Sequence, residues 1–169
     1  MNVASLILAS IFLMIIIKGL KKGRPGSRAA VKKLKLKGID AFHTLFFSLT
    51  PDEKYIEYQM KKAMYLVDES GMQQYNDLKE KGFFNSILSS SSILTLQTDS
   101  IVLDMKKSYF RYYGKLKIDR RSTTVVRSLV TEGYLKDIRP SDNNMNGVLI
   151  TGWKTLENKD LQDVEKNTF

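Results

Sequence analysis

The N-terminal residues place an apolar run directly before a run of positive charge, and this order limits what the chain can form. Residues 3–17 contain no charged side chain, whereas residues 18–37 contain nine Lys or Arg and no acid. The whole chain holds 27 basic and 18 acidic residues, a net charge of +9, so residues 38–169 are balanced. The excess positive charge therefore belongs to a short segment beside the apolar run and not to the rest of the chain.

Residues 1–17 are predicted to be a transmembrane anchor. A helix needs about 17 to 25 apolar residues to span a bilayer, so this run either just spans the membrane or lies in its interface. A secretory signal peptide would carry its positive charge before the apolar run, and here the charge comes after it. Because basic loops stay in the cytoplasm, we expect a single pass with the N-terminus outside and the C-terminal domain cytoplasmic, or the same arrangement in a virion membrane.

Residues 18–37 are predicted to be a basic juxtamembrane segment. Anionic lipid headgroups attract Lys and Arg side chains that lie near the membrane surface. The residues expected to contact the headgroups are Lys18, Lys21, Lys22, Arg24, Arg28, Lys32 and Lys33. Membrane lipid is therefore the first expected partner.

Residues 38–92 are predicted to form a helical spacer or subdomain. Thr50, Pro51 and Glu53 are typical of a helix start, with Thr50 as the cap, and apolar residues follow at helical spacing as far as Val67. A shorter polar helix is expected after it. The serine run that closes this region is typical of a linker, so a domain boundary is expected there.

Residues 93–169 are predicted to fold as two helices and a small β-hairpin. The first helix is expected over residues 101–113, and the second one, capped by Asp119 or Ser122, ends near Glu132. Two short strands around a polar turn follow. The whole chain is therefore expected to be mainly α with a small β-hairpin, with an N-terminal transmembrane helix, a helical middle region and this C-terminal domain.

The order of helix, short turn, helix and hairpin resembles the winged-helix variant of the helix-turn-helix superfamily. Residues 121–135 are similar to a recognition helix and its exit, and residues 148–153 are similar to the strand that leaves the wing. The resemblance implies that the second helix enters the major groove of duplex DNA. The DNA-binding residues that it implies are Arg120, Arg121, Thr123, Thr124 and Arg127, with Lys115 and Lys117 at backbone phosphates.

Two functions are consistent with this organisation. The main prediction is a membrane-anchored DNA-binding protein, similar in layout to phage or plasmid proteins, that tethers or organises DNA at the cytoplasmic face of a membrane. Winged helices also bind proteins, so the alternative is a single-pass structural component of a membrane-containing virion or of a secretion or conjugation assembly. Other assembly proteins and further copies of the chain are expected partners. A membrane-bound transcription regulator would need a sensing element, which the sequence does not show.

No enzymatic activity, cofactor or metal site is predicted. His43 is the one histidine and lies among apolar residues, where a packed imidazole is expected rather than a general base. The sequence contains no Cys, which excludes disulfides and thiolate metal sites. It also lacks a Gly-rich phosphate loop and a nucleophile motif.

Overall fold

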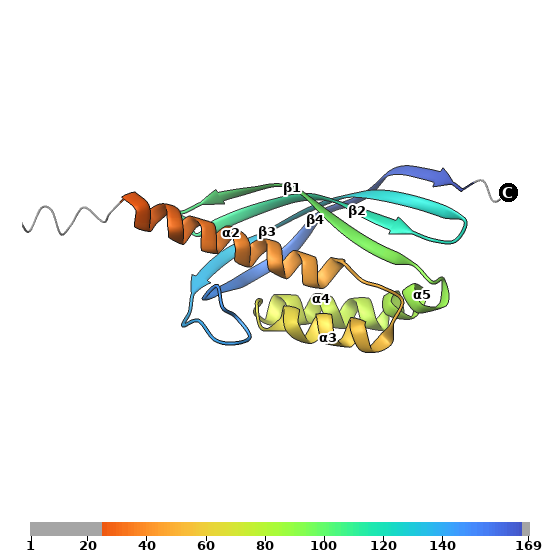
Figure 1. Ribbon diagram of the computed structural model, residues 1–169, viewed down its shortest axis with the longest axis horizontal. Coiled ribbons are helices and arrows are strands. Elements are labelled where there is room, and N and C mark those ends of the chain that lie inside the picture. Colours follow the sequence, from red (N-terminus) through yellow and green to blue (C-terminus); the bar gives the residue numbers. More distant parts are fainter. Residues whose placement is uncertain (1–24, 167–169) are drawn as a thin grey trace, which may run out of the picture. The chain divides into compact units, whose positions relative to one another are not determined.

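The computed structural model describes residues 25–166 (Figure 1). The chain divides into two units after Lys33, and the described part of the first unit is the beginning of one helix. Among the described residues, no helix combines the length and the apolar character needed to cross a membrane. The anchor predicted at residues 1–17 lies outside the described part of the chain.

The described residues form helices first and strands afterwards. The helices are α2 (Pro25–Phe47), α3 (Glu53–Met64), α4 (Glu69–Glu80) and α5 (Phe83–Ser89). The strands are β1 (Ile93–Asp104), β2 (Tyr109–Asp119), β3 (Thr123–Asp137) and β4 (Val148–Glu165). All neighbouring strands are antiparallel and the sheet has the order β1-β2-β3-β4.

The side chains of β2 show why this segment is a strand. Phe110, Tyr112, Leu116 and Ile118 are buried, and the residues between them are exposed or half-buried, apart from Gly114 on the buried face. Alternation with a period of two places every second residue on the same face of a sheet. The apolar face of β2 is therefore turned toward the helices.

The prediction of a mainly α chain with a C-terminal winged helix is wrong. The first predicted helix, residues 101–113, forms the end of β1, a turn and the start of β2, and the predicted recognition helix lies in β3. The first half of β3 is rich in Thr and Val, whose branched side chains pack well on a pleated surface and lose rotamer freedom in a helix. The predicted hairpin does form, from the end of β3 and the start of β4, as part of the larger sheet.

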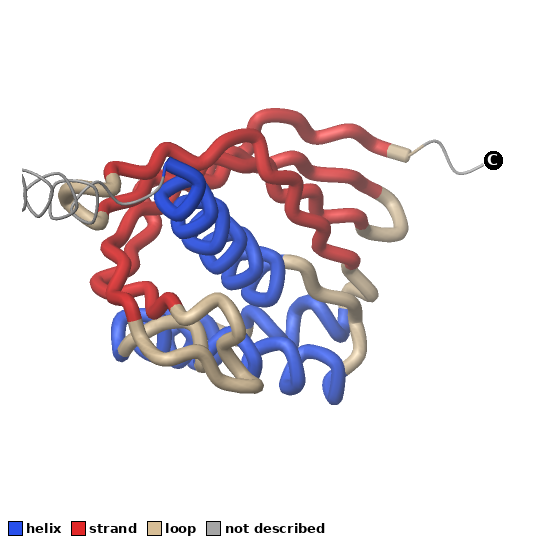
Figure 2. The backbone as a smooth tube through the Cα atoms, turned by 60° about the vertical axis from the view of Figure 1, so that its left-hand side comes forward, coloured by secondary structure: helices blue, strands red, loops and turns tan. Residues whose placement is uncertain are grey.

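In the second unit, the helices cover one face of the sheet, and the sheet curves around α2 (Figures 1 and 2). Phe42 and Phe46 of α2 meet Trp153 of β4, with ring centroids 4.8 and 5.0 Å from the Trp153 ring. Burying one large apolar side chain stabilises a fold by about 1.5–3 kcal/mol. The core contains residues from both sides of residue 92, where the sequence predicts a linker.

The start of β4 is fastened to the connection between α3 and α4. Ile150 donates its N–H to the Leu66 carbonyl and accepts from the Asp68 N–H, both at 2.8 Å. The Asp68 carboxylate also accepts from the Gly152 N–H at 3.0 Å, and Ser70 Oγ accepts from the Trp153 N–H at 2.7 Å. These bonds satisfy backbone groups at the sheet edge and hold α3 and α4 against the sheet.

Candidate protein-interaction site

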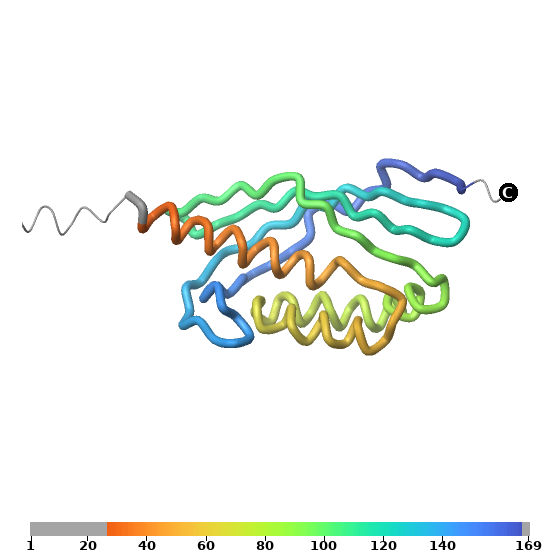
Figure 3. Tube along the Cα trace, viewed as in Figure 1, coloured from red at the N-terminus to blue at the C-terminus, as the bar shows by residue number. Residues whose placement is uncertain are grey.

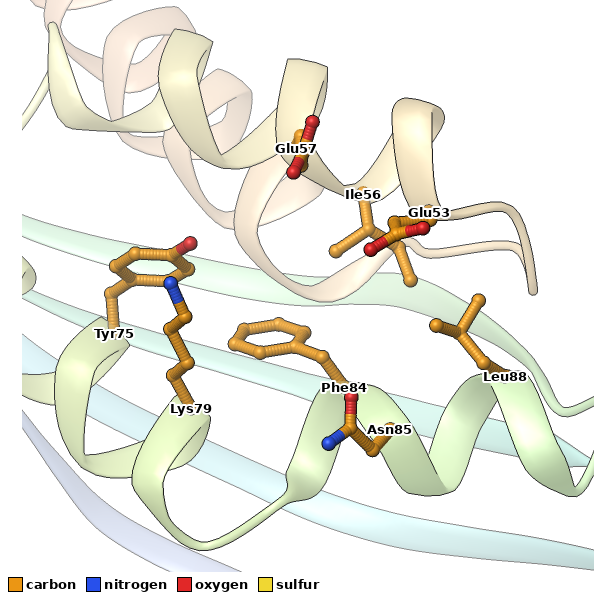
Figure 4. Close-up of a pocket in the computed structure, with 8 residues that line it drawn as sticks. All are labelled: Glu53, Ile56, Glu57, Tyr75, Lys79, Phe84, Asn85 and Leu88. Atoms are coloured by element: carbon orange, nitrogen blue, oxygen red, sulfur yellow. The ribbon is translucent and has the colours of Figure 1, made fainter.

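A groove between α3, α4 and α5 is the candidate site (Figure 4). It has a volume of about 240 Å³, below the roughly 300–1,000 Å³ of pockets that enclose whole small ligands. Its lining residues are Glu53, Ile56, Glu57, Tyr75, Lys79, Phe84, Asn85 and Leu88. A space of this size fits one side chain of a partner better than an entire small molecule.

Helix capping sets the positions of the groove walls. Asp52 caps α3, because its carboxylate accepts from the Tyr55 N–H at 2.9 Å, so the cap lies two residues after the predicted Thr50. Asp68 caps α4 in the same way through the Ser70 N–H at 3.0 Å. Gly82 has a φ of 71°, a left-handed conformation that glycine adopts without strain. The chain turns at this residue and α5 begins immediately after it.

The groove combines an apolar floor with charges of both signs. Glu53 and Glu57 lie one helical turn apart on α3, and Lys79 extends beside the Tyr75 ring on the opposite wall (Figure 4). Within residues 25–166, no ion pair joins any of these three charged groups to an opposite charge. The Phe84 ring points between the walls. Such a surface is suited to binding an amphipathic protein segment.

His43 lies away from this groove and is fully buried. Its Nδ1 donates to the Ile39 carbonyl at 2.7 Å, so Nε2 accepts from the Thr131 hydroxyl at 2.6 Å. Desolvation by burial lowers the pKa of His43 from 6.5 to about 3, although the bond to Ile39 acts in the opposite direction. The imidazole is therefore neutral and packed, which confirms the expectation from its apolar surroundings.

No metal centre is formed by the His, Asp and Glu side chains of residues 25–166. The most connected polar cluster lies around Glu132 of β3. Its carboxylate accepts from the Tyr109 hydroxyl at 2.5 Å, from Arg111 at 2.8 Å and from Lys154 at 3.0 Å. These bonds, with the one from Tyr109 as the largest cause, lower the pKa of Glu132 to about 2. Because every charge has a partner, we interpret the cluster as structural.

The residues predicted to bind DNA lie on strands and on the turn between them. Lys115 and Lys117 are in β2, Arg120 and Arg121 are in the β2–β3 turn, and Thr123, Thr124 and Arg127 are in β3. The recognition helix on which the prediction depended is therefore absent. These residues lie on two adjacent strands and the turn that joins them, and none of them lies on a helix that could insert into a groove of DNA.

Several of these residues also have partners within the domain. Arg127 pairs with Asp160 of β4, and the Thr124 hydroxyl donates to Asp119 at 3.2 Å. Lys117 lies 4.0 Å from the same Asp119 carboxylate. The positive charge that suggested a nucleic-acid surface is thus partly neutralised by neighbouring strands.

The residues predicted to contact lipid headgroups are described only in part. Arg28, Lys32 and Lys33 are exposed on the first turns of α2, which begins at Pro25. Lys18, Lys21, Lys22 and Arg24 lie outside the described residues.

Sequence reasoning missed the groove. Glu53 and Glu57 are four residues apart on a predicted helix, and like charges at this spacing are unfavourable unless something outside the helix compensates them. That spacing was the available signal. The aromatic half of the groove, Tyr75 and Phe84, could not be paired with these residues before the turn at Gly82 was known.

The chain matches no protein-family model and no curated protein sequence. Its structure is similar to that of the VirB8 protein of Agrobacterium tumefaciens, with a TM-score of 0.62 and 9% identity over 83% of this chain and 96% of that one. The TraE protein in complex with 2-(2-furyl)isonicotinic acid matches with a TM-score of 0.62 and 10% identity, over 75% of this chain and 96% of that one. The soluble domain of the TrwG type IV secretion machinery of Bartonella grahamii matches with a TM-score of 0.61 and 13% identity, over 83% of this chain and 99% of that one. At these identities the likeness establishes the fold: the described domain has the architecture that VirB8, TraE and TrwG share.

Proposed function

We propose that the protein is a structural component of a type IV secretion or conjugation machine. The observation that carries the proposal is the match to TrwG, a part of such a machine, which covers nearly all of the TrwG domain. The match supports the secretion or conjugation branch of the alternative function over a DNA-tethering role. The groove between α3, α4 and α5 supports binding to protein, because it offers a small apolar floor under unpaired charges.

In this proposal the chain is not an enzyme, and its partners are other machine subunits and further copies of itself. Residues 1–17 attach it to a membrane and residues 18–37 contact anionic headgroups. The basic segment favours a cytoplasmic location for the folded domain. Because the chain has no Cys, a single cysteine at the exposed Ser89 would test the side of the membrane with an impermeant maleimide. Labelling in intact cells would place the domain on the outer side and contradict this part of the proposal.

The function is tested by purifying the tagged full-length protein in detergent from the organism that encodes it and identifying what accompanies it. Subunits of a secretion or conjugation machine are expected, together with a loss of conjugative transfer when the gene is deleted. Virion proteins, or an unchanged transfer frequency after deletion, would contradict the proposal.

The groove is tested in the same purification with two matched variants. Glu57→Lys changes one groove charge, and Glu165→Lys makes the same change at an exposed residue of β4 outside the groove. We expect the first variant to lose a machine subunit and the second to retain it. Equal retention in both variants would remove the groove from the proposed function.

A further inference from the structure

A second hollow lies on the far half of α3, where tyrosine and lysine side chains meet the β3–β4 loop. It has a volume of about 380 Å³ and is lined by Tyr58, Lys61, Lys62, Tyr65 and Asn143, and we name it the Tyr–Lys hollow. Tyr58 is 56% exposed and Tyr65 is 43% exposed. Large aromatic side chains left this open to solvent on one short helix face are typical of protein contact surfaces.

The loop between β3 and β4 lies beside the C-terminal end of α3 (Figure 3), and its hydrogen bonds hold the lining of the hollow in place. Asn144 is buried, and its side-chain amide donates to the Tyr65 carbonyl at 3.2 Å and to the Val148 carbonyl at 2.9 Å. Ser141 and Asn144 also exchange two backbone hydrogen bonds, of 3.1 and 2.9 Å. A surface that is already ordered loses little entropy when a partner binds.

The charges of the hollow select the chemistry of the partner. Among residues 25–166, neither Lys61 nor Lys62 forms an ion pair, and the Asp142 carboxylate in the loop is joined to neither. Lys62 lies 5.8 Å from the centre of the Tyr58 ring and donates to Asn143 at 3.3 Å. Two ammonium groups beside two phenols offer hydrogen-bond donors to carboxylates and flat apolar faces to aliphatic side chains.

We propose that the Tyr–Lys hollow binds an acidic segment of another protein, in which Asp or Glu alternates with apolar residues. The inference depends on the proposed function, since it specifies the chemistry of one partner in the assembly. Carboxylates of the segment accept from Lys61, Lys62 and the tyrosine hydroxyls, and its apolar side chains lie on the rings of Tyr58 and Tyr65. The groove at the other end of α3, which carries Glu53 and Glu57, repels such a segment.

The test uses the purified full-length protein in detergent and a fluorescein-labelled peptide in which Asp and Glu alternate with Leu. A second peptide has Asn and Gln in place of the acids. Fluorescence anisotropy is expected to show binding of the acidic peptide alone, and binding that weakens as salt is added. The Lys61→Glu/Lys62→Glu variant, and separately Tyr58→Ala, should weaken it roughly tenfold or more.

The matched control is Lys106→Glu/Lys107→Glu, which makes the same charge change at an exposed lysine pair in the β1–β2 turn. Circular dichroism verifies that every variant is folded. An equal loss of binding in the control pair would show attraction by net charge, and no binding of the acidic peptide would also overturn the proposal. The proposal would also be overturned if the peptide does not bind and Lys61 and Lys62 are instead needed for binding to phosphatidylglycerol vesicles or for self-association of the chain.

The two proposals fail in different ways. If machine subunits accompany the protein but peptide binding does not depend on Lys61 and Lys62, the Tyr–Lys hollow is excluded as the binding site and the proposed function stands. If the peptide binds through the hollow but no machine subunit is found, the site stands and the assembly is a different one.

Discussion

The imidazole ring of His43 lies flat on the phenol ring of Tyr112, with centroids 3.8 Å apart and planes 6° from parallel. One ring belongs to α2 and the other to β2, so the stack fastens the helix to the centre of the sheet. Tyr112 continues the contact through its hydroxyl, which is 2.8 Å from Thr98 Oγ1 on β1. Burial, the largest cause, raises the pKa of Tyr112 to about 12, so both rings stay neutral at physiological pH.

The buried state of His43 predicts a specific loss of stability in acid. The pKa of His43 is about 3 in the folded protein and 6.5 in the unfolded chain. Between these pH values the unfolded chain therefore binds a proton that the folded chain does not. The free energy of unfolding should therefore decrease as the pH falls below about 6.5, by at most about 1.4 kcal/mol per pH unit. Urea unfolding from pH 7 to pH 5 measures the slope.

The variant His43→Gln isolates this effect, because an amide titrates nowhere in that range and retains a donor and an acceptor. We expect it to be less stable at pH 7 and to have a flatter pH dependence above pH 5, where the carboxylates stay ionised in both states. A slope identical to that of the natural protein would show that His43 is accessible to protons in the folded state.

Asn144 and Asn143 are neighbours with opposite surroundings, which makes them a matched pair. Asn144→Ala should lower the free energy of unfolding by about 1–3 kcal/mol, because the buried Val148 carbonyl and the partly buried Tyr65 carbonyl lose a donor. Asn143→Ala removes one exposed hydrogen bond from Lys62 and should change the free energy of unfolding by less than about 0.5 kcal/mol. Hydrogen exchange in the β3–β4 loop should accelerate in the first variant alone.

The helical half of the domain was more predictable from sequence than the sheet. Capping residues and the helical spacing of apolar residues predicted α3, although its cap was misplaced by two residues, and a shorter polar helix was expected where α4 lies. The short helix α5 was not predicted. In the sheet, the two helices expected to end at residue 113 and near Glu132 each stop just before a glycine, Gly114 or Gly133, which is a common helix terminator. A Cβ at Gly114 would lie 2.8 Å from the Gln97 carbonyl, and one at Gly133 would lie 3.1 Å from the Phe110 ring.

These glycines are therefore needed for close approach between strands, a requirement that local sequence does not distinguish from helix termination. The candidate sites were less predictable still. Glu53 and Glu57 lie on one helix, but their groove is completed by Phe84 after a left-handed turn, and the Tyr–Lys hollow needs Asn143 from a loop some eighty residues later along the chain. Tertiary contacts of this kind leave no periodic signal.

The cluster around Glu132 predicts a different pH response, on the outer face of the sheet. Hydrogen bonds from Tyr109, Arg111 and Lys154 lower the pKa of Glu132 to about 2, so its stabilising effect is present above about pH 4.5 and is lost as the pH falls toward 2. Glu132→Gln should be less stable at pH 7, and its difference from the natural protein should shrink in acid. Glu165→Gln, at an exposed residue of β4 whose carboxylate forms no ion pair among the described residues, should show no such difference by thermal unfolding.

Two glycines on helices should respond in opposite ways to the same substitution. A Cβ at Gly71 of α4 would lie 2.3 Å from Cγ1 of the buried Val67, so Gly71→Ala should destabilise the fold by about 1–3 kcal/mol. At Gly38 of α2 the nearest atoms would be 3.5 Å away, an ordinary contact, so Gly38→Ala should be neutral or stabilise by up to about 1 kcal/mol. Chemical denaturation of both variants measures the contrast.

Adding Val67→Ala should recover part of the loss at Gly71 in a double-mutant cycle, because it removes the atom in conflict. Strictly additive losses at these two residues would mean that α4 moves as a whole and that the contact between Val67 and Gly71 does not fix its position.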